Sequence, residues 1–266
     1  MGGVLKVDFI GAGNLAYNLA PALENAGATV RNIYSRNLEN SIKLVNKLYE
    51  GQVKEDLDFS ESTSDIFIIA VPDDVIEDIV KELVLPENAI IAHTSGSIPL
   101  SILGYAATPN IGVIYPLQTF IKNNQVDFNT IPILIEGDNK HTTQALSALA
   151  QLLSSNVQEV SSAQRQSIHL AAVFACNFTN WMLTQSSVIM EEANLDFKLL
   201  QTLIAQTINN AFETGPENAQ TGPAKRGDFE VLDTHMSMLA TKPAFQELYQ
   251  IISQQILDHH QNLTNE

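Results

Sequence analysis

Cysteine and basic residues are scarce in this chain, and each scarcity excludes a class of protein. The 266 residues include one cysteine, Cys176, so no disulfide can form within the chain and we expect a reducing compartment. Lysine and arginine number 14 against 30 aspartates and glutamates, which gives a net charge of −16. A charge of this sign argues against nucleic acid and against an anionic membrane as partners.

Long apolar runs are also missing. No apolar stretch approaches the length of a membrane span, and no basic segment followed by an apolar one opens the chain, so we expect a cytoplasmic protein. Hydrophobic residues still make up 45% of the sequence, as in a globular chain. Cys176 lies inside an apolar stretch, 170–176, which indicates a buried, inert thiol.

The start of the chain carries the clearest motif. An apolar strand over 4–10 runs into Gly11, Gly13 and Ala16, a G-x-G-x-x-A pattern that opens a helix predicted over 14–26. Gly11 permits a tight turn, Gly13 lets the backbone approach a pyrophosphate, and Ala16 keeps helix and strand close. The helix N-terminus favours an anion through its free N–H groups and its dipole. The pattern predicts a dinucleotide site; the alternative is a structural glycine turn.

The end of the second strand, 29–34, indicates which dinucleotide binds. NAD sites place Asp or Glu there to hold the ribose hydroxyl, whereas arginine accommodates a 2′-phosphate. This chain has Ser35, Arg36 and Asn37, with no carboxylate. A guanidinium can bind phosphate oxygens in bidentate fashion, so we predict NADP(H) as the cofactor. The alternative is a serine or asparagine N-cap of a helix over 38–49, beside a solvated arginine.

Strand and helix patterns alternate through the first half. Further strands are predicted at 65–71, 89–92, 111–114, 131–135 and 157–160, and helices at 74–83 and 140–153. Asp73 can cap the helix at 74, and Pro132 favours a sheet edge or a strand start. The alternation predicts an α/β fold with a parallel, doubly wound sheet.

From residue 161 onward the pattern is helical. Helices are predicted at 162–191, 196–213, 229–240 and 244–260, with a polar Gly/Pro loop at 214–228. We therefore expect two domains, a Rossmann domain at 1–158 that binds NADP(H) and a helical domain at 159–266.

The first of these helices combines an apolar segment with a polar stripe. Residues 170–176 are apolar all round, which predicts a buried helix. At helical spacing, one face carries Ser162, Gln166, His169, Asn177, Asn180 and Thr184. Buried hydrogen-bonding groups need partners, so the stripe faces a substrate cleft, a polar seam on another helix or subunit, or solvent. His169 is either a structural histidine or a functional one.

Loops at the carboxyl ends of the strands are candidates for the rest of the site, because ligands bind there in open α/β sheets. They are the segments 71–73, 93–97 and 115–119. Among them Ser97 can be an N-cap, with Pro99 in the first turn of a short helix. No metal-ligand spacing stands out.

A Gly/Pro loop near the C-terminal helices holds two cations. Lys225 and Arg226 either bind an anion, such as a substrate carboxylate or a cofactor phosphate, or pair with surface acids. Asp228 can cap the next helix.

With these motifs in place, the chain resembles a known group of proteins. The first half is similar to the NADP-binding domain shared by pyrroline-5-carboxylate reductases and deazaflavin-dependent NADP oxidoreductases. The whole chain resembles bacterial Rossmann-like proteins with a helical C-terminal domain of unknown function. The segments that carry the resemblance are Gly11–Ala16, 93–96, 115–120, 169–178 and 221–228. It implies a helical domain like that of the β-hydroxyacid dehydrogenases and a homodimer formed through the helices.

The chain departs from its dehydrogenase relatives at one position. The related hydroxyacid dehydrogenases carry Lys-x-x-x-Asn on this helix, with the lysine as general acid or base. Asn177 matches the asparagine, but Val173 occupies the lysine position and cannot transfer a proton. If the chain is an enzyme, His169 is the first candidate for proton donor and His93 the second, since imidazole titrates near neutral pH.

These observations predict an NADPH-dependent oxidoreductase that transfers hydride to a small C=O or C=N substrate between the domains. The alternatives are a non-catalytic NADP-binding sensor or scaffold, suggested by Val173, and an S-adenosylmethionine methyltransferase, which Ser35-Arg36-Asn37 argues against.

The candidate catalytic residues are His169, Asn177 and His93. The candidate cofactor-binding residues are Gly11, Gly13, Asn14, Leu15, Ser35, Arg36, Asn37, Val71, Pro72, Thr94 and Ser95. The candidate substrate-binding residues are Asn180, Gln118, Lys225 and Arg226.

Overall fold

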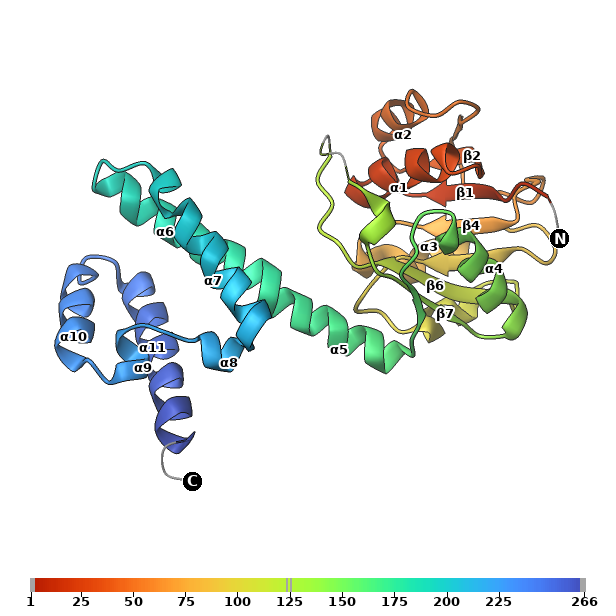
Figure 1. Cartoon of the computed structure of the whole chain (residues 1–266). Coiled ribbons are helices and arrows are strands. Elements are labelled where there is room, and N and C mark those ends of the chain that lie inside the picture. The colour runs from red at the N-terminus through yellow and green to blue at the C-terminus, as the bar shows by residue number, and fades with distance from the viewer. Residues whose placement is uncertain (1–2, 123, 125, 264–266) are drawn as a thin grey trace. The chain divides into compact units, whose positions relative to one another are not determined.

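A computed structural model describes residues 3–122, 124 and 126–263 of the chain (Figure 1). Within them the chain divides into two compact units, residues 1–174 and 175–266. The helix that starts at residue 162 therefore belongs to the first unit by its contacts. We predict a domain boundary at 158/159 because the alternation of strand and helix patterns gives way there to helical patterns alone. This boundary stays a prediction.

The first unit contains one mixed sheet. Its strands are β1 (Lys6–Ile10), β2 (Thr29–Tyr34), β3 (Gln52–Lys54), β4 (Ile66–Ile69), β5 (Ile90–His93), β6 (Ile111–Pro116), β7 (Ile133–Gly137) and β8 (Val157–Glu159). They lie in the order β3-β2-β1-β4-β5-β6-β7-β8. The sheet is parallel from β3 to β6, as predicted for a doubly wound fold, but β7 is antiparallel to β6 and parallel to β8. The predicted parallel, doubly wound fold is confirmed, and β7 departs from it by running antiparallel to β6. The sequence pattern did not indicate this, because a strand that returns antiparallel has the same apolar pattern.

Helices cover both faces of this sheet. They are α1 (Asn14–Asn25), α2 (Leu38–Val45), α3 (Ile76–Glu82) and α4 (Lys140–Gln151), with 3₁₀ turns η1 (Asp73–Val75), η2 (Leu100–Tyr105) and η3 (Phe128–Thr130). The helix α5 (Ser162–Ala172) follows β8, and Arg165 is its one fully buried residue. Alternate residues of β4 separate the two faces: Ile66 and Ile68 join the core under α1 and α4, and Phe67 and Ile69 join the core under α3. Burial on both faces explains the unbroken apolar run in the sequence.

Some local predictions need correction. The helix predicted over 38–49 ends at Val45, and strand β3 after it was missed because Gln52–Lys54 is short and half polar. Asp73 does not cap a helix at 74; its carboxylate accepts a hydrogen bond from the Ser97 hydroxyl. Ser97 is likewise no N-cap, because η2 begins after Pro99. Pro132 stands just before β7, at a strand start as expected.

The second unit is helical. A π-helical segment η4 (Val173–Phe178) joins α5 to α6 (Thr179–Glu192), followed by η5 (Phe197–Leu200), α7 (Gln201–Thr214), α8 (Pro216–Ala219), α9 (Pro223–Arg226), α10 (Phe229–Met238) and α11 (Pro243–Leu263). The predicted loop at 214–228 thus contains two short helices. Asp228 caps α10 as expected, through the Val231 N–H.

The second unit buries few apolar side chains. Among its described residues, Ala224 and Leu257 are the hydrophobic ones that reach full burial, and α6 and α7 contain none. Leu170 on α5 is 59% exposed and Cys176 is exposed. The predictions of a buried helix and a buried thiol were therefore wrong for the single chain, because an apolar pattern does not say what covers it.

No described helix of the chain is both long enough and apolar enough to cross a membrane.

Candidate active site

A pocket of about 490 Å³ opens at the carboxyl ends of β1, β2 and β4. Seven of the predicted cofactor residues line it: Gly11, Gly13, Ser35, Arg36, Asn37, Val71 and Pro72. The sequence pattern did not predict that Tyr34 and Asn40 also line this pocket, because that depends on where β2 and α2 lie in the folded chain. Among the described lining residues Arg36 alone is charged, so the pocket suits an anion.

The glycine turn of this pocket is shaped for close approach of a ligand. Gly11 has φ +115°, and a Cβ there would lie 2.2 Å from the Ala70 carbonyl oxygen, so no other residue fits. The N-cap of α1, Gly13, makes no side-chain capping bond, and the first turn, from Asn14 and Leu15, holds no acidic residue. Its N–H groups are therefore available for a pyrophosphate, as the fingerprint predicted.

The residues after β2 divide between structure and ligand. Asn37 is the N-cap of α2 and accepts from the Glu39 N–H at 3.0 Å, as one alternative proposed. Arg36 is exposed, and it forms none of the ion pairs found within the described residues. Lys122 donates to Asn40 Oδ1 at 3.3 Å and adds a second cation beside the pocket, which the sequence reading missed. These groups fit the 2′-phosphate of NADP(H).

A second group of polar residues gathers at the ends of β5 and β6. Thr94 donates through its hydroxyl to the Ile69 carbonyl at 3.1 Å. The hydroxyl of Tyr115 lies 3.1 Å from His169 Nδ1, and the two rings meet edge to face with centroids 6.1 Å apart. Tyr115 was part of a loop singled out in the sequence, but its contact with α5 required the tertiary structure. In the same loop, Oε1 of the Gln118 side chain accepts a hydrogen bond from the backbone N–H of Thr119.

A buried arginine holds this group together. Arg165 on α5 is fully buried; it pairs with Glu136 of β7 and donates through Nε to the Ser95 carbonyl at 3.1 Å. A second guanidinium nitrogen donates to the Ile98 carbonyl. The loop after β5 is thereby tied to α5, a role that the sequence did not signal.

The polar stripe predicted on the helix after residue 161 is divided between the two units. Ser162 donates to Glu136 and Gln166 donates to the Ser97 carbonyl at 2.7 Å, so the stripe's first turns form a seam against the sheet domain. Asn177 and Asn180 belong to the second unit and are exposed. Their predicted roles in catalysis and substrate binding stay predictions.

His93 is fully buried at the end of β5, where its Nδ1 accepts from the Ser95 N–H at 3.1 Å. Burial, with a smaller contribution from the Arg165 charge, lowers the pKa of His93 to about 4. The ring is therefore neutral at pH 7, with its single proton on Nε2 because Nδ1 accepts, and a neutral imidazole is a very weak acid. This argues against His93 as the second proton donor and assigns it a structural role in holding the loop.

The cations of the 221–228 loop have partners within the second unit. Lys225 donates to the Gln220 carbonyl at 2.8 Å, and Arg226 lies 3.8 Å from Asp228. Arg226 therefore has an acid beside it, as the alternative of pairing with surface acids proposed, whereas the partner found for Lys225 is a backbone carbonyl. Anion binding by either residue stays a prediction.

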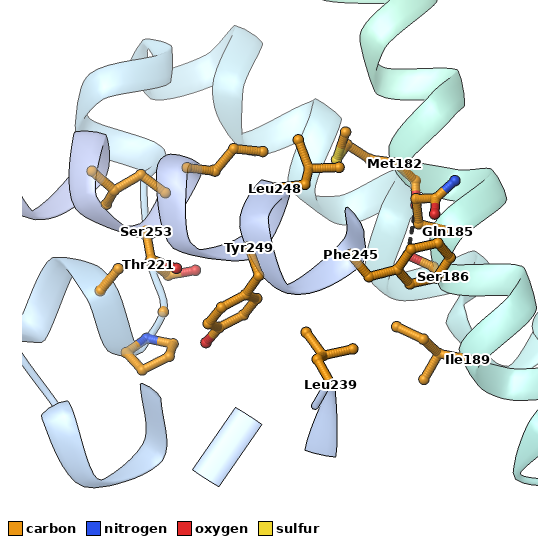
Figure 2. Close-up of a pocket in the computed structure, with 15 residues that line it drawn as sticks. Met182, Gln185, Ser186, Ile189, Thr221, Leu239, Phe245, Leu248, Tyr249 and Ser253 are labelled. Carbon is orange, nitrogen blue, oxygen red and sulfur yellow. Dashed lines mark hydrogen bonds between the residues drawn. The ribbon is translucent and has the colours of Figure 1, made fainter. Parts of the chain in front are cut away.

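The second unit has a pocket of its own, shown in Figure 2, with a volume of about 330 Å³. Its walls are mostly apolar and include Met182, Leu239, Phe245 and Tyr249. The sequence reading proposed none of its lining residues for catalysis or cofactor binding. No group of three metal-binding side chains occurs within the described residues.

A glycine turn on β1 and an arginine in a pocket without carboxylates define a dinucleotide-binding α/β protein suited to NADP. The family model "NADP oxidoreductase coenzyme F420-dependent" matches residues 6–96, and "Domain of unknown function (DUF2520)" matches residues 131–256. The putative NADP oxidoreductase BF3122 from Bacteroides fragilis is 39% identical, with 96% of this chain and 98% of that chain covered and a TM-score of 0.87. The chain therefore belongs to this NADP oxidoreductase family.

More distant structures share the fold. Protein TM1727 from Thermotoga maritima is 22% identical with a TM-score of 0.69, over 97% of this chain and 99% of that chain. The reductive aminase from Aspergillus terreus, in complex with NADPH and ethyl levulinate, is 12% identical with a TM-score of 0.74, over 96% and 93%. A comparison with curated proteins finds no match. These distant structures show the fold alone. The family match and the 39% identical relative show that the chain is an NADP-dependent oxidoreductase, and they do not give its substrate.

Replacing Arg36 tests the choice of cofactor. Arg36→Ala should weaken NADPH binding roughly ten- to a hundredfold, because a hydrogen bond to a charged group contributes about 1.5–3 kcal/mol. NADH binding should barely change. Titration followed by cofactor fluorescence measures both, with Lys43→Ala on the exposed side of α2 as the control. Equal losses for the two cofactors would contradict the assignment.

Replacing His93 tests its buried, neutral state. The pKa of His93 is about 4 in the fold against 6.5 for the free residue, so only the unfolded chain takes up a proton as the pH falls below 6.5. Between pH 7 and pH 5 this should cost the folded protein about 2 kcal/mol. Urea unfolding should show that His93→Asn, which keeps an acceptor for the Ser95 N–H, loses this part of the pH dependence. The variant His141→Gln, at an exposed position of α4, should retain it.

Proposed function

We propose that the protein reduces a small carbonyl or imine compound with NADPH and that His169 donates the proton. The observation that carries this proposal is the position of His169. Its ring is held by Tyr115 at the carboxyl edge of the sheet, against the loop that follows β5. Bound NADPH supplies a hydride, and the remaining requirement is a proton donor for the heteroatom of the substrate.

The residues of the first pocket would hold the cofactor. The glycine turn and the first turn of α1 take the pyrophosphate, and Arg36 with Ser35 takes the 2′-phosphate. Because Arg36 lies at the β2 side, the nicotinamide half is expected to extend the other way, past Val71 and Pro72 toward Thr94 and Ser95.

The absence of the relatives' lysine makes His169 the natural candidate. Val173 cannot carry a proton, and His169 lies one turn earlier on the same helix. Imidazole can exchange protons between about pH 5 and 8, which suits general acid catalysis. An imine substrate, already cationic, would require less help from the acid than a ketone. We propose Gln118, Asn177, Asn180, Lys225 and Arg226 as contacts for this small-molecule substrate.

The His169→Ala variant tests the proton donor. The consumption of NADPH is followed with a panel of ketones, oxo acids and cyclic imines that includes ethyl levulinate and dibenz[c,e]azepine. Loss of a general acid should lower kcat about a hundredfold or more while the Kd for NADPH stays unchanged. The control is Ser167→Ala on the same helix, whose side chain bonds its own backbone. A loss of less than about threefold would remove His169 from the mechanism, since general acids contribute far more.

We further propose that the helical unit assembles with a second copy of the chain. Large apolar side chains lie exposed on its helices, among them Trp181 on α6 and Leu203 and Phe212 on α7. Within the single chain, α6 and α7 contain no buried residue, so these side chains leave a large apolar surface in contact with water that a partner surface could cover. A homodimer through the helices would provide that surface.

Light scattering coupled to gel filtration tests the dimer. The wild-type chain should elute at twice its 29.1 kDa mass. Trp181→Glu should shift the protein to monomer or aggregate, because a charge would be buried in the interface. Glu191→Gln, an exposed polar position on the same helix, should leave the dimer intact. A wild-type monomer at micromolar concentration would contradict the proposal.

A further inference from the structure

We infer that Tyr115 is the positioning residue of His169, fixing the ring so that Nε2 is the atom that delivers the proton. The inference rests on the proposed function and adds to it a second residue and a defined atom. It starts from the contact between the Tyr115 hydroxyl and His169 Nδ1, 3.1 Å apart with the rings edge to face at 69°.

A hydroxyl suits this position because it both donates and accepts hydrogen bonds. When His169 is neutral, the Tyr115 hydroxyl donates to Nδ1, and the ring proton is held on Nε2. When His169 is protonated, Nδ1–H donates to the Tyr115 oxygen instead. Tyr115 therefore remains bonded in both states, and proton exchange is directed to Nε2.

The surroundings of the pair prevent the rings from moving apart. A Cβ on Gly96 would lie 2.6 Å from His169 Nδ1 and 2.8 Å from Tyr115 Cζ, so both rings pack directly on the Gly96 backbone. That backbone is fixed by neighbouring bonds, from Arg165 to the Ser95 carbonyl and from Gln166 to the Ser97 carbonyl. The pair is thus packed against a backbone segment that hydrogen bonds from α5 hold on both sides of Gly96.

The strand register places this pair beside the expected nicotinamide end. Ile69 at the end of β4 pairs with His93 of β5, and His93 pairs with Val113 of β6. Tyr115 follows Val113 by two residues and therefore lies at the same edge as Pro72 and Thr94. Neighbouring strands are about 4.8 Å apart, so the pair is one or two strand spacings from the end of the first pocket.

The chemical step balances with the groups named. Bound NADPH would supply the hydride for the new C–H bond and would leave as NADP⁺, while the electron pair of the C=O or C=N bond moves to the heteroatom. That atom takes the proton from Nε2 of protonated His169, which leaves the ring neutral. A proton taken up from the solvent restores protonated His169, so each turnover consumes one NADPH and one proton.

Nitrogen NMR of the histidine side chains tests the inference without any substrate. In the ¹⁵N-histidine-labelled full chain, neutral His169 should show the Nε2–H tautomer in a single population. Tyr115→Phe keeps the ring but removes the hydroxyl, and should give a mixture of the two tautomers. An unchanged His169 spectrum in this variant would overturn the inference, whatever the enzyme reduces.

Turnover supplies the second measurement. With the panel compound that oxidises NADPH, Tyr115→Phe should lower kcat roughly tenfold or more while the NADPH Kd stays within about twofold, since orientation of the acid is lost but the cofactor site is not. Gly96→Ala should impair both readouts by displacing the rings. An altered tautomer with unchanged kcat would overturn the role in proton delivery. A wild-type protein that binds NADPH but reduces no panel compound would instead refute the proposed function, with the NMR result standing by itself.

Discussion

The candidate site depends on the ion pair and the hydrogen bonds that the buried guanidinium of Arg165 forms. A charge in the interior is costly unless it is paired and fully hydrogen-bonded, and here Glu136 and two backbone carbonyls of the loop after β5 satisfy it. The same bonds fix that loop against α5, so they define where His169 and Gly96 meet. The Arg165 charge also helps to keep His93 neutral. One ion pair thereby links the sheet, the loop and the helix that form the site.

The two units are stabilised in different ways. The sheet domain has an apolar core on each face, and its central strands β4 and β5 are buried at every residue. The helical unit exposes many of its large apolar side chains and has an apolar pocket of its own. The homodimer that we propose would cover the apolar side chains that the helical unit exposes.

Much of the cofactor site could be predicted from local sequence, because short-range rules decide it. The turn at Gly11 needs a residue that tolerates a positive φ, and the residues after β2 follow directly from where that strand ends. The pair that we propose for proton donation, His169 and Tyr115, could be predicted only in part. His169 was found from helical spacing, but Tyr115 lies 54 residues away in the chain and becomes its partner only through folding. Arg165 gave no signal, since a lone arginine on a helix usually faces solvent.

The sequence by itself determined the alternation of strands and helices, the glycine turn and the positive charge after β2, because each depends on residues that are close in the chain. The tertiary structure decided the direction of β7, the burial of His93 and Arg165, and the exposure of the apolar helices. These properties depend on which segments, distant in the sequence, pack against one another. An apolar pattern indicates that a surface is to be buried, but it does not indicate what buries it. For the helical unit, the single chain leaves that surface open.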